Sequence, residues 1–186
     1  WLLSCYNNPS KFLHWRLNRP STFPRVTKSM RRWEITAVGR ENLRLAQVAA
    51  PVPGPRELLI RTSAVSLNSR DKLFLDSGGY VHFALPFTPG SDMAGVVESV
   101  GPGVTSVAPG DHIVTSFIPS CGRSRWCASG KQNLCDNGAL MMTGSQLDGT
   151  FRMHYQGHDV GQSSFVGTFS QYSVMPEFAC IKIPEH

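Results

Sequence analysis

The fold of this chain is predicted most clearly by residues 86–114, PFTPGSDMAGVVESVGPGVTSVAPGDHIV. This stretch alternates short β-rich runs with glycine–proline turns such as Gly101-Pro102-Gly103 and Pro109-Gly110-Asp111. Glycine permits a positive φ, proline fixes its own φ, and the β-branched residues between the turns favour a pleated, half-buried surface. The stretch therefore predicts strands joined by tight turns, as in a small β-barrel.

The sequence on either side of this stretch continues the pattern. Further strands are predicted over residues 32–38, 43–48, 58–67, 167–174 and 179–183. Residues 71–76 predict a short helix, and the polar, glycine-rich residues 144–162 predict an excursion from the barrel. The predicted fold class is therefore mainly β, with a few short helices.

Two motifs in a fixed order give the chain a family resemblance. PGSDMAGVVESVGPGV at residues 89–104, followed by GDHIV at 110–114, resembles the core motif of the GroES-like N-terminal domain of medium-chain alcohol dehydrogenases and quinone reductases. CGRSRWCASGKQNLC, residues 121–135, is similar to the structural-zinc lobe of the zinc-containing members, and we term it the cysteine lobe. The resemblance implies a GroES-like β-barrel with a cysteine lobe over residues 30–186.

The cysteine lobe keeps three of the four ligands of the family pattern C-G-x-C-x-x-C, in which a fourth cysteine follows eight positions later. Cys121, Cys127 and Cys135 match the first, third and fourth ligands, and Ser124 replaces the second. Zinc prefers four thiolate or imidazole ligands, and a neutral hydroxyl is a poor ligand in a soft site. Two interpretations stay open: a structural zinc held by three thiolates plus water or a hydroxyl, or a metal-free lobe with reduced cysteines.

The resemblance also locates a second metal site, whose ligands this chain lacks. Zinc alcohol dehydrogenases carry C-x-T-D and G-H-E at positions where this chain has Asn68-Ser69-Arg70-Asp71 and Gly90-Ser91-Asp92. The two ligands are replaced by Asn68 and Ser91, so no catalytic zinc is expected. The N-x-x-D pattern is similar to the zinc-independent branch, in which hydrogen bonds position a substrate carbonyl and NAD(P)H supplies the hydride.

We therefore predict a substrate pocket lined by Asn68, Ser91 and Tyr80. The alternative for Asn68 is a cap on the short helix that follows, because asparagine is common at that position. For Ser91 and Tyr80 a purely structural role stays open.

Charge is distributed unevenly along the chain. The formal net charge is +5, but five basic residues and no acidic one precede Met30. The part from Met30 onward is close to neutral, which argues against nucleic-acid binding. No apolar run approaches the ~18 residues of a membrane span. Residues 1–29 are expected to be a basic extension outside the fold, either sequence upstream of a start at Met30 or an organelle transit peptide.

Three of the five cysteines cluster in one loop, which is typical of reduced or metal-binding cysteines rather than of a disulfide framework. We therefore expect a cytoplasmic location, or the organelle matrix if residues 1–29 are a transit peptide. No G-x-G-x-x-G follows a predicted strand, since Ser106 stands where the third glycine would follow Gly101 and Gly103. A Rossmann domain is therefore expected to be absent from this chain.

With these observations, the resemblance implies the substrate-side domain of an NAD(P)-dependent alcohol dehydrogenase or of a carbonyl or quinone reductase, inactive without a coenzyme domain. The expected partners are a small carbonyl or alcohol substrate, together with a coenzyme-binding domain or a second copy in a homo-oligomer. The alternative is a non-catalytic GroES-like binding or scaffold module.

Overall fold

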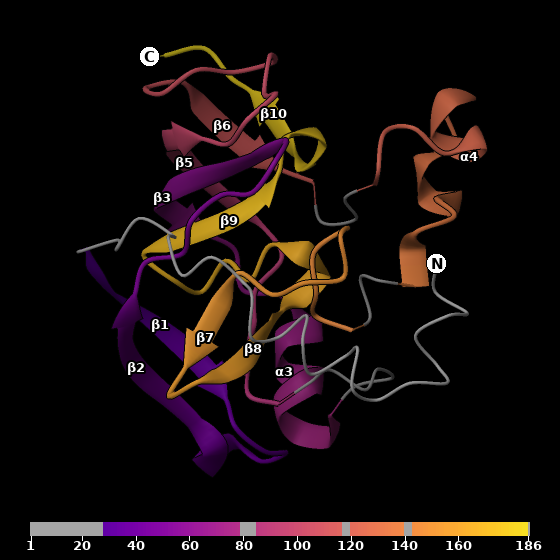
Figure 1. The fold of residues 1–186 in the computed structure, drawn as a ribbon. Helices are drawn as coiled ribbons and strands as arrows, with labels where there is room; N and C mark the ends of the chain where they lie inside the picture. The colour runs from indigo at the N-terminus through magenta and orange to yellow at the C-terminus, as the bar shows by residue number, and fades with distance from the viewer. Residues whose placement is uncertain (1–27, 79–84, 117–119, 140–142, 186) are drawn as a thin grey trace, which may run out of the picture.

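The computed structural model describes residues 28–78, 85–116, 120–139 and 143–185. Two five-stranded sheets make up most of the molecule, with the strand orders β2-β1-β4-β8-β7 and β10-β6-β5-β3-β9 (Figure 1). The strands are β1 (Ser29–Ile35), β2 (Leu43–Ala49), β3 (Glu57–Val65), β4 (Phe87–Thr88), β5 (Met93–Val100), β6 (His112–Thr115), β7 (Met153–Tyr155), β8 (His158–Gln162), β9 (Tyr172–Pro176) and β10 (Cys180–Lys182). The helices are α3 (Ser69–Ser77) and α4 (Arg125–Ala128), with short 3-10 helices η1 (Arg40–Asn42), η2 (Gln132–Leu134), η4 (Ser163–Phe165) and η5 (Glu177–Ala179). The predicted mainly β fold is confirmed.

The glycine-rich stretch forms strands joined by tight turns, as predicted, with β4 in the first sheet and β5 and β6 in the second. β5 pairs antiparallel with β3 on one side and with β6 on the other. The turn after β5 brings two backbones together, because a Cβ atom added at Gly101 would lie 1.8 Å from the carbonyl oxygen of Gly54. Only glycine allows so close an approach of two chain segments.

Each sheet buries its own group of apolar side chains. In the second sheet the buried group is Leu58, Ile60, Met93, Val97, Ile113, Val166, Met175 and Ala179. In the first sheet it includes Met30, Val48, Met153 and Val160, together with Leu59, Tyr172 and Val174 from the second. The two sheets therefore share part of their core, which fixes their relative position.

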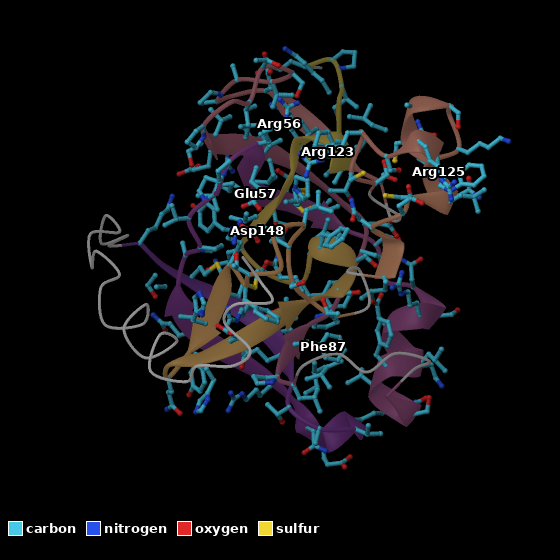
Figure 2. All side chains as sticks on the ribbon, turned by 45° about the vertical axis from the view of Figure 1, so that its right-hand side comes forward. Arg56, Glu57, Phe87, Arg123, Arg125 and Asp148 are labelled. Carbon is cyan, nitrogen blue, oxygen red and sulfur yellow. The ribbon has the colours of Figure 1, made fainter. Side chains whose placement is uncertain are left out.

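Residues 144–162 differ from the predicted excursion, because they contribute the hairpin β7–β8 to the first sheet. The prediction followed their polar composition, but the mostly buried Arg152 pairs with the buried Glu57. Its guanidinium donates to Glu57 at 2.7 and 2.8 Å and to Asp148 at 2.7 Å, and Figure 2 shows Glu57 and Asp148 close together. A paired buried charge replaces the apolar contacts that a sequence pattern would reveal.

Strand β9 begins at Tyr172, five residues after the start of the run predicted over 167–174. The preceding residues hydrogen-bond to β1 instead: Trp33 N–H donates to the carbonyl of Phe169 at 2.8 Å, and Gln171 N–H to that of Arg31 at 3.0 Å. This segment therefore crosses from the first sheet to the second. At the other end of the domain, β1 already begins at Ser29, while residues 1–27 lie outside the described part.

Two helical segments flank the sheets. Helix α3 packs on β4 through Phe74 and Phe87, whose rings meet edge to face with centroids 5.5 Å apart. The cysteine lobe, which contains α4, projects away from both sheets (Figure 1). Within the described residues, no helix has the length and apolar character needed to cross a bilayer.

Candidate functional site

The cysteine lobe brings its three thiols together through local turns. Ser124 caps the N-terminus of α4 by accepting a hydrogen bond from the backbone N–H of Cys127. Gly122 and Gly130 adopt positive φ values of 71° and 78°, which let the chain turn back on itself on both sides of α4. These turns bring the three cysteines together, and no residue of the lobe belongs to the hydrophobic clusters of the described residues.

The three thiols form one cluster. The sulfur atoms of Cys121, Cys127 and Cys135 all lie within 4.8 Å of one another, and the first two are 3.9 Å apart. Sulfur ligands on one zinc ion, at Zn–S distances of about 2.3 Å in a tetrahedron, lie about 3.8 Å apart. The cluster therefore fits a metal ion of this kind.

Hydrogen bonds around the cluster favour thiolates at two of its members. The Ser124 hydroxyl, 3.3 Å from the Cys127 sulfur, is the main cause that lowers the pKa of Cys127. Burial by itself would raise the pKa of Cys121, but the hydrogen bonds to its sulfur, led by those from the backbone N–H groups of Arg123 and Ser124, together outweigh burial and lower that pKa to about 6. Burial raises the pKa of Cys135. A metal ligand must be deprotonated, so this arrangement also suits metal binding.

The predicted pocket residues Asn68 and Ser91 meet at one carboxylate. Asn68 stands at the N-cap position of α3, and its side-chain amide donates to Asp92 Oδ2 at 2.7 Å. Ser91 is buried, and its hydroxyl lies 3.5 Å from the same oxygen. The sequence therefore identified two residues that lie together but missed Asp92 as their common partner. Tyr80 lies outside the described residues.

Asp71 fixes the loop geometry behind this pair. Its carboxylate accepts the backbone N–H of Asn68 at 2.9 Å and that of Gly90 at 3.1 Å, which joins the two segments of the site. Burial is the largest effect on this carboxyl and raises its pKa despite these bonds. Arg70 stacks over the ring of Phe74 at 5.3 Å, and the described residues offer it no ion pair within 4 Å.

The residues around Asp92 do not fit a catalytic zinc. An amide nitrogen is not a zinc ligand, and here it faces the only carboxylate among the three side chains. Because a carboxylate only accepts hydrogen bonds, the amide must present its N–H groups to it. Neither thiolate nor imidazole belongs to this group, so the donor set lacks the ligands that zinc prefers.

Two concave surfaces accompany these sites. A pocket of about 270 Å³ lies beside the cysteine lobe and is lined by Arg56, Cys121, Gly122, Arg123 and Phe178. A larger groove of about 460 Å³ runs along β1, β3 and the crossing segment, and its exposed apolar side chains are Trp33, Leu45, Val65 and Leu67. The sequence pattern gave no signal for either, because each joins residues distant in the chain.

Comparison with known proteins gives one consistent result. Residues 54–185 match the family described as the alcohol dehydrogenase GroES-like domain. An NDMA-dependent alcohol dehydrogenase from Amycolatopsis methanolica is 44% identical over 134 residues, which cover 71% of this chain and 36% of that protein. The chain thus spans about a third of the length of the curated relatives it matches.

Solved structures agree with this match. An alcohol dehydrogenase zinc-binding domain protein from Burkholderia ambifaria superposes with a TM-score of 0.77 at 27% identity, covering 86% of this chain and 43% of that one. A cobalt- and zinc-bound thermostable alcohol dehydrogenase from Pyrobaculum aerophilum superposes with a TM-score of 0.63 at 29% identity, with the same coverage.

The two-sheet barrel and its projecting thiol cluster define a GroES-like domain of the zinc-type, medium-chain class. The chain belongs to the alcohol dehydrogenase GroES-like domain family. The predicted resemblance is confirmed.

Proposed function

We propose that this chain forms the substrate side of the cleft in an NAD(P)-dependent alcohol dehydrogenase, or in a carbonyl or quinone reductase, and that this cleft works without a catalytic zinc. The observation that carries the proposal is the 2.7 Å hydrogen bond from the Asn68 amide to Asp92, with Ser91 beside it. The alcohol dehydrogenase name of the Amycolatopsis methanolica relative supports the reaction class. Since that relative is almost three times longer than the match, we assign coenzyme binding to a further domain.

In this proposal Asn68 is the group that contacts substrate. One of its two amide hydrogens is held by Asp92, so the side chain is fixed before substrate arrives. The second is available to a carbonyl oxygen, and a fixed donor of this kind stabilises charge that develops on that oxygen. The nicotinamide supplies or accepts the hydride. Asp92 acts as a positioning residue.

The test is a screen for NAD(P)H oxidation with aldehydes, ketones and quinones. It uses the full-length protein encoded by the natural reading frame that contains this chain. Replacing Asn68 by alanine is expected to lower kcat/KM about 100-fold, the typical cost of losing one oxyanion donor. The exposed Asn133→Ala variant serves as the matched control and should leave kcat/KM unchanged. An Asn68→Ala enzyme with unchanged kcat/KM would refute the assigned role. The 186-residue chain alone should oxidise no NAD(P)H above a denatured control.

For the cysteine lobe we infer a structural zinc held by Cys121, Cys127 and Cys135. The support is the fit of the three sulfur positions to one ion and the hydrogen bonds that favour thiolates. The described cysteines are all free of disulfides, which is consistent with the reducing cytoplasm that we propose as the location. Zinc analysis of protein purified without chelators tests the ion.

A non-catalytic binding module remains the second candidate, and the apolar groove favours it. Trp33, Leu45 and Val65 are 42–50% exposed and Leu67 is 80% exposed, all along one groove. Contiguous exposed apolar side chains mark interaction surfaces. A coenzyme domain or a second copy of the chain would cover such a surface in either candidate, so the discriminating result is the activity screen: no turnover in the naturally translated protein favours the binding module.

A further inference from the structure

We propose that Ser124 makes the cysteine lobe an open metal site, whose fourth coordination position takes the thiolate of a small, carboxylate-bearing thiol. This inference rests on the structural metal proposed above. It differs from that proposal in assigning an exchangeable ligand to a lobe that would otherwise be closed. Closed structural zinc sites have four protein ligands, whereas open sites have three and leave one position for another molecule.

The position of Ser124 identifies the open corner. Its hydroxyl oxygen lies 3.3 Å from the Cys127 sulfur and 3.9 Å from the Cys135 sulfur. An oxygen and a sulfur on one tetrahedral zinc ion, with bonds of about 2.1 and 2.3 Å, lie about 3.6 Å apart. The serine oxygen therefore stands near the corner that a fourth cysteine would fill.

Ser124 is a weak occupant of this corner for two reasons. Its oxygen already accepts the backbone N–H of Cys127 at 3.4 Å, as the cap of α4. Its hydroxyl group also donates to the Cys127 sulfur at 3.3 Å. A neutral hydroxyl engaged in two hydrogen bonds competes poorly with an anionic, soft donor for a metal already bound by thiolates.

The surroundings select the charge of the incoming molecule. The pocket beside the lobe reaches the cluster at Cys121 and carries the guanidinium groups of Arg56 and Arg123. Figure 2 shows these two arginines close together. Arg56 is paired with the buried Glu177, whereas Arg123 is exposed and forms no ion pair with a residue in the described ranges.

Among the described residues that line the pocket, Arg123 is therefore the cation without an ion pair, and it directly precedes Ser124 in the chain. Guanidinium groups bind carboxylates through charge-assisted, often bidentate hydrogen bonds. A thiol with a short carboxylate tail would place its sulfur on the metal and its carboxylate on Arg123. The thiol proton passes to solvent on binding, and no electrons are transferred.

The experiment uses the metal-free 186-residue chain loaded with Co²⁺, whose visible bands report its ligands. Co²⁺ should first produce a near-ultraviolet sulfur-to-metal charge-transfer band. Titration with 3-mercaptopropionate should then change the visible bands of the wild type and strengthen the charge-transfer band toward that of Ser124→Cys. The Ser124→Cys protein, with its fourth thiolate in place, should not respond, and Ser124→Ala should respond at least as strongly as the wild type.

The arginine contribution is measured in the same titration. Arg123→Ala should weaken 3-mercaptopropionate binding about 3- to 10-fold, while binding of the uncharged 2-mercaptoethanol stays the same. Arg125→Ala is the matched control, because Arg125 stacks on Trp126 and faces Asp136 rather than lining the pocket. It should leave both affinities unchanged.

The outcomes separate this inference from the metal on which it depends. If the wild type shows no charge-transfer band with Co²⁺, the structural metal is refuted, and the open position with it. If Co²⁺ binds through thiolates but its visible bands do not change on addition of 3-mercaptopropionate, the structural metal is supported and the open position is refuted. The same holds if Ser124→Cys responds as strongly as the wild type or if Ser124→Ala does not respond.

Discussion

The cysteine lobe and the Asn68–Asp92 site lie at the two positions where the resemblance to zinc-containing alcohol dehydrogenases places metal ligands, yet the two sites have different chemistry. The lobe retains three thiols within 4.8 Å of one another. The other site has an amide and a hydroxyl on one carboxylate, with neither thiol nor imidazole among the three. Metal-ligand geometry can therefore be present at one of these sites and missing from the other, because separate parts of the fold build them.

The two sites also differ in how they are held. The lobe depends on short turns within fifteen residues, whereas the Asn68–Asp92 site depends on packing between β3, α3 and the residues before β5. Changes in packing should therefore damage the second site far more than the first. Changes in the thiols should do the reverse.

The largest effect is expected from Gly90→Ala. Gly90 has a φ of 91°, and a Cβ atom there would lie 2.3 Å from Thr168 Oγ1 and 2.5 Å from the ring of Phe169. Backbone strain and the clash together should lower the free energy of unfolding by about 3 kcal/mol in urea titrations. The control is Gly130→Ala in the lobe, which also has a positive φ but nothing within 4 Å, and should lose about 1 kcal/mol. Equal losses would contradict the comparison.

The second-largest effect is expected on metal binding in the cysteine lobe. Cys127→Ala removes one of three thiolates and should weaken zinc or Co²⁺ binding about 100-fold, since structural zinc binding of about 10–16 kcal/mol is shared among its ligands. Chelator competition measures the affinity. Cys180→Ala is the control, because burial raises the pKa of that thiol to about 12 and it lies outside the cluster. A Cys127→Ala protein that keeps wild-type affinity would exclude the cluster as the binding site.

A third, smaller effect probes the carboxylate that joins Asn68 and Ser91. Asp92→Ala leaves the Asn68 amide without its 2.7 Å acceptor and should cost about 2 kcal/mol of unfolding free energy. Asp136→Ala in the lobe removes only a partly exposed carboxylate 3.7 Å from Arg125 and should change stability by less than about 0.5 kcal/mol. A loss of similar size in the two variants would show that Asp92 is not a structural partner of Asn68.

The smallest effect is a pH dependence at Asp71. Burial raises the pKa of Asp71 in the folded state above the ordinary value of 3.8, so protonation favours the folded protein. Relative to Asp71→Asn, the wild type should gain stability as pH falls through the raised pKa and should level off below 3.8. Urea unfolding of both proteins between pH 7 and 3 measures this difference. A constant or falling difference would mean that hydrogen bonds outweigh burial at this carboxyl.

Residue order alone predicts the strand pattern, the family and the grouping of the three cysteines in one loop. The glycine–proline turns of residues 86–114 fix where strands begin and end, because backbone freedom at those positions is local. The spacing of Cys121, Cys127 and Cys135 likewise acts within one loop, and the three sulfurs lie within 4.8 Å of one another. Interactions between residues close in the chain are readable from residue order alone.

The contacts between residues distant in the chain, in contrast, come from the tertiary structure. It placed Asp92 on the amide of Asn68, 24 positions earlier, and Arg152 on Glu57, 95 positions earlier. It also turned the polar residues 144–162 into a hairpin of the first sheet and put Arg123 beside Arg56. These contacts depend on the closure of two sheets around a shared core, and the hydrophobic and electrostatic energies that fix it are summed over the whole domain rather than over any one stretch.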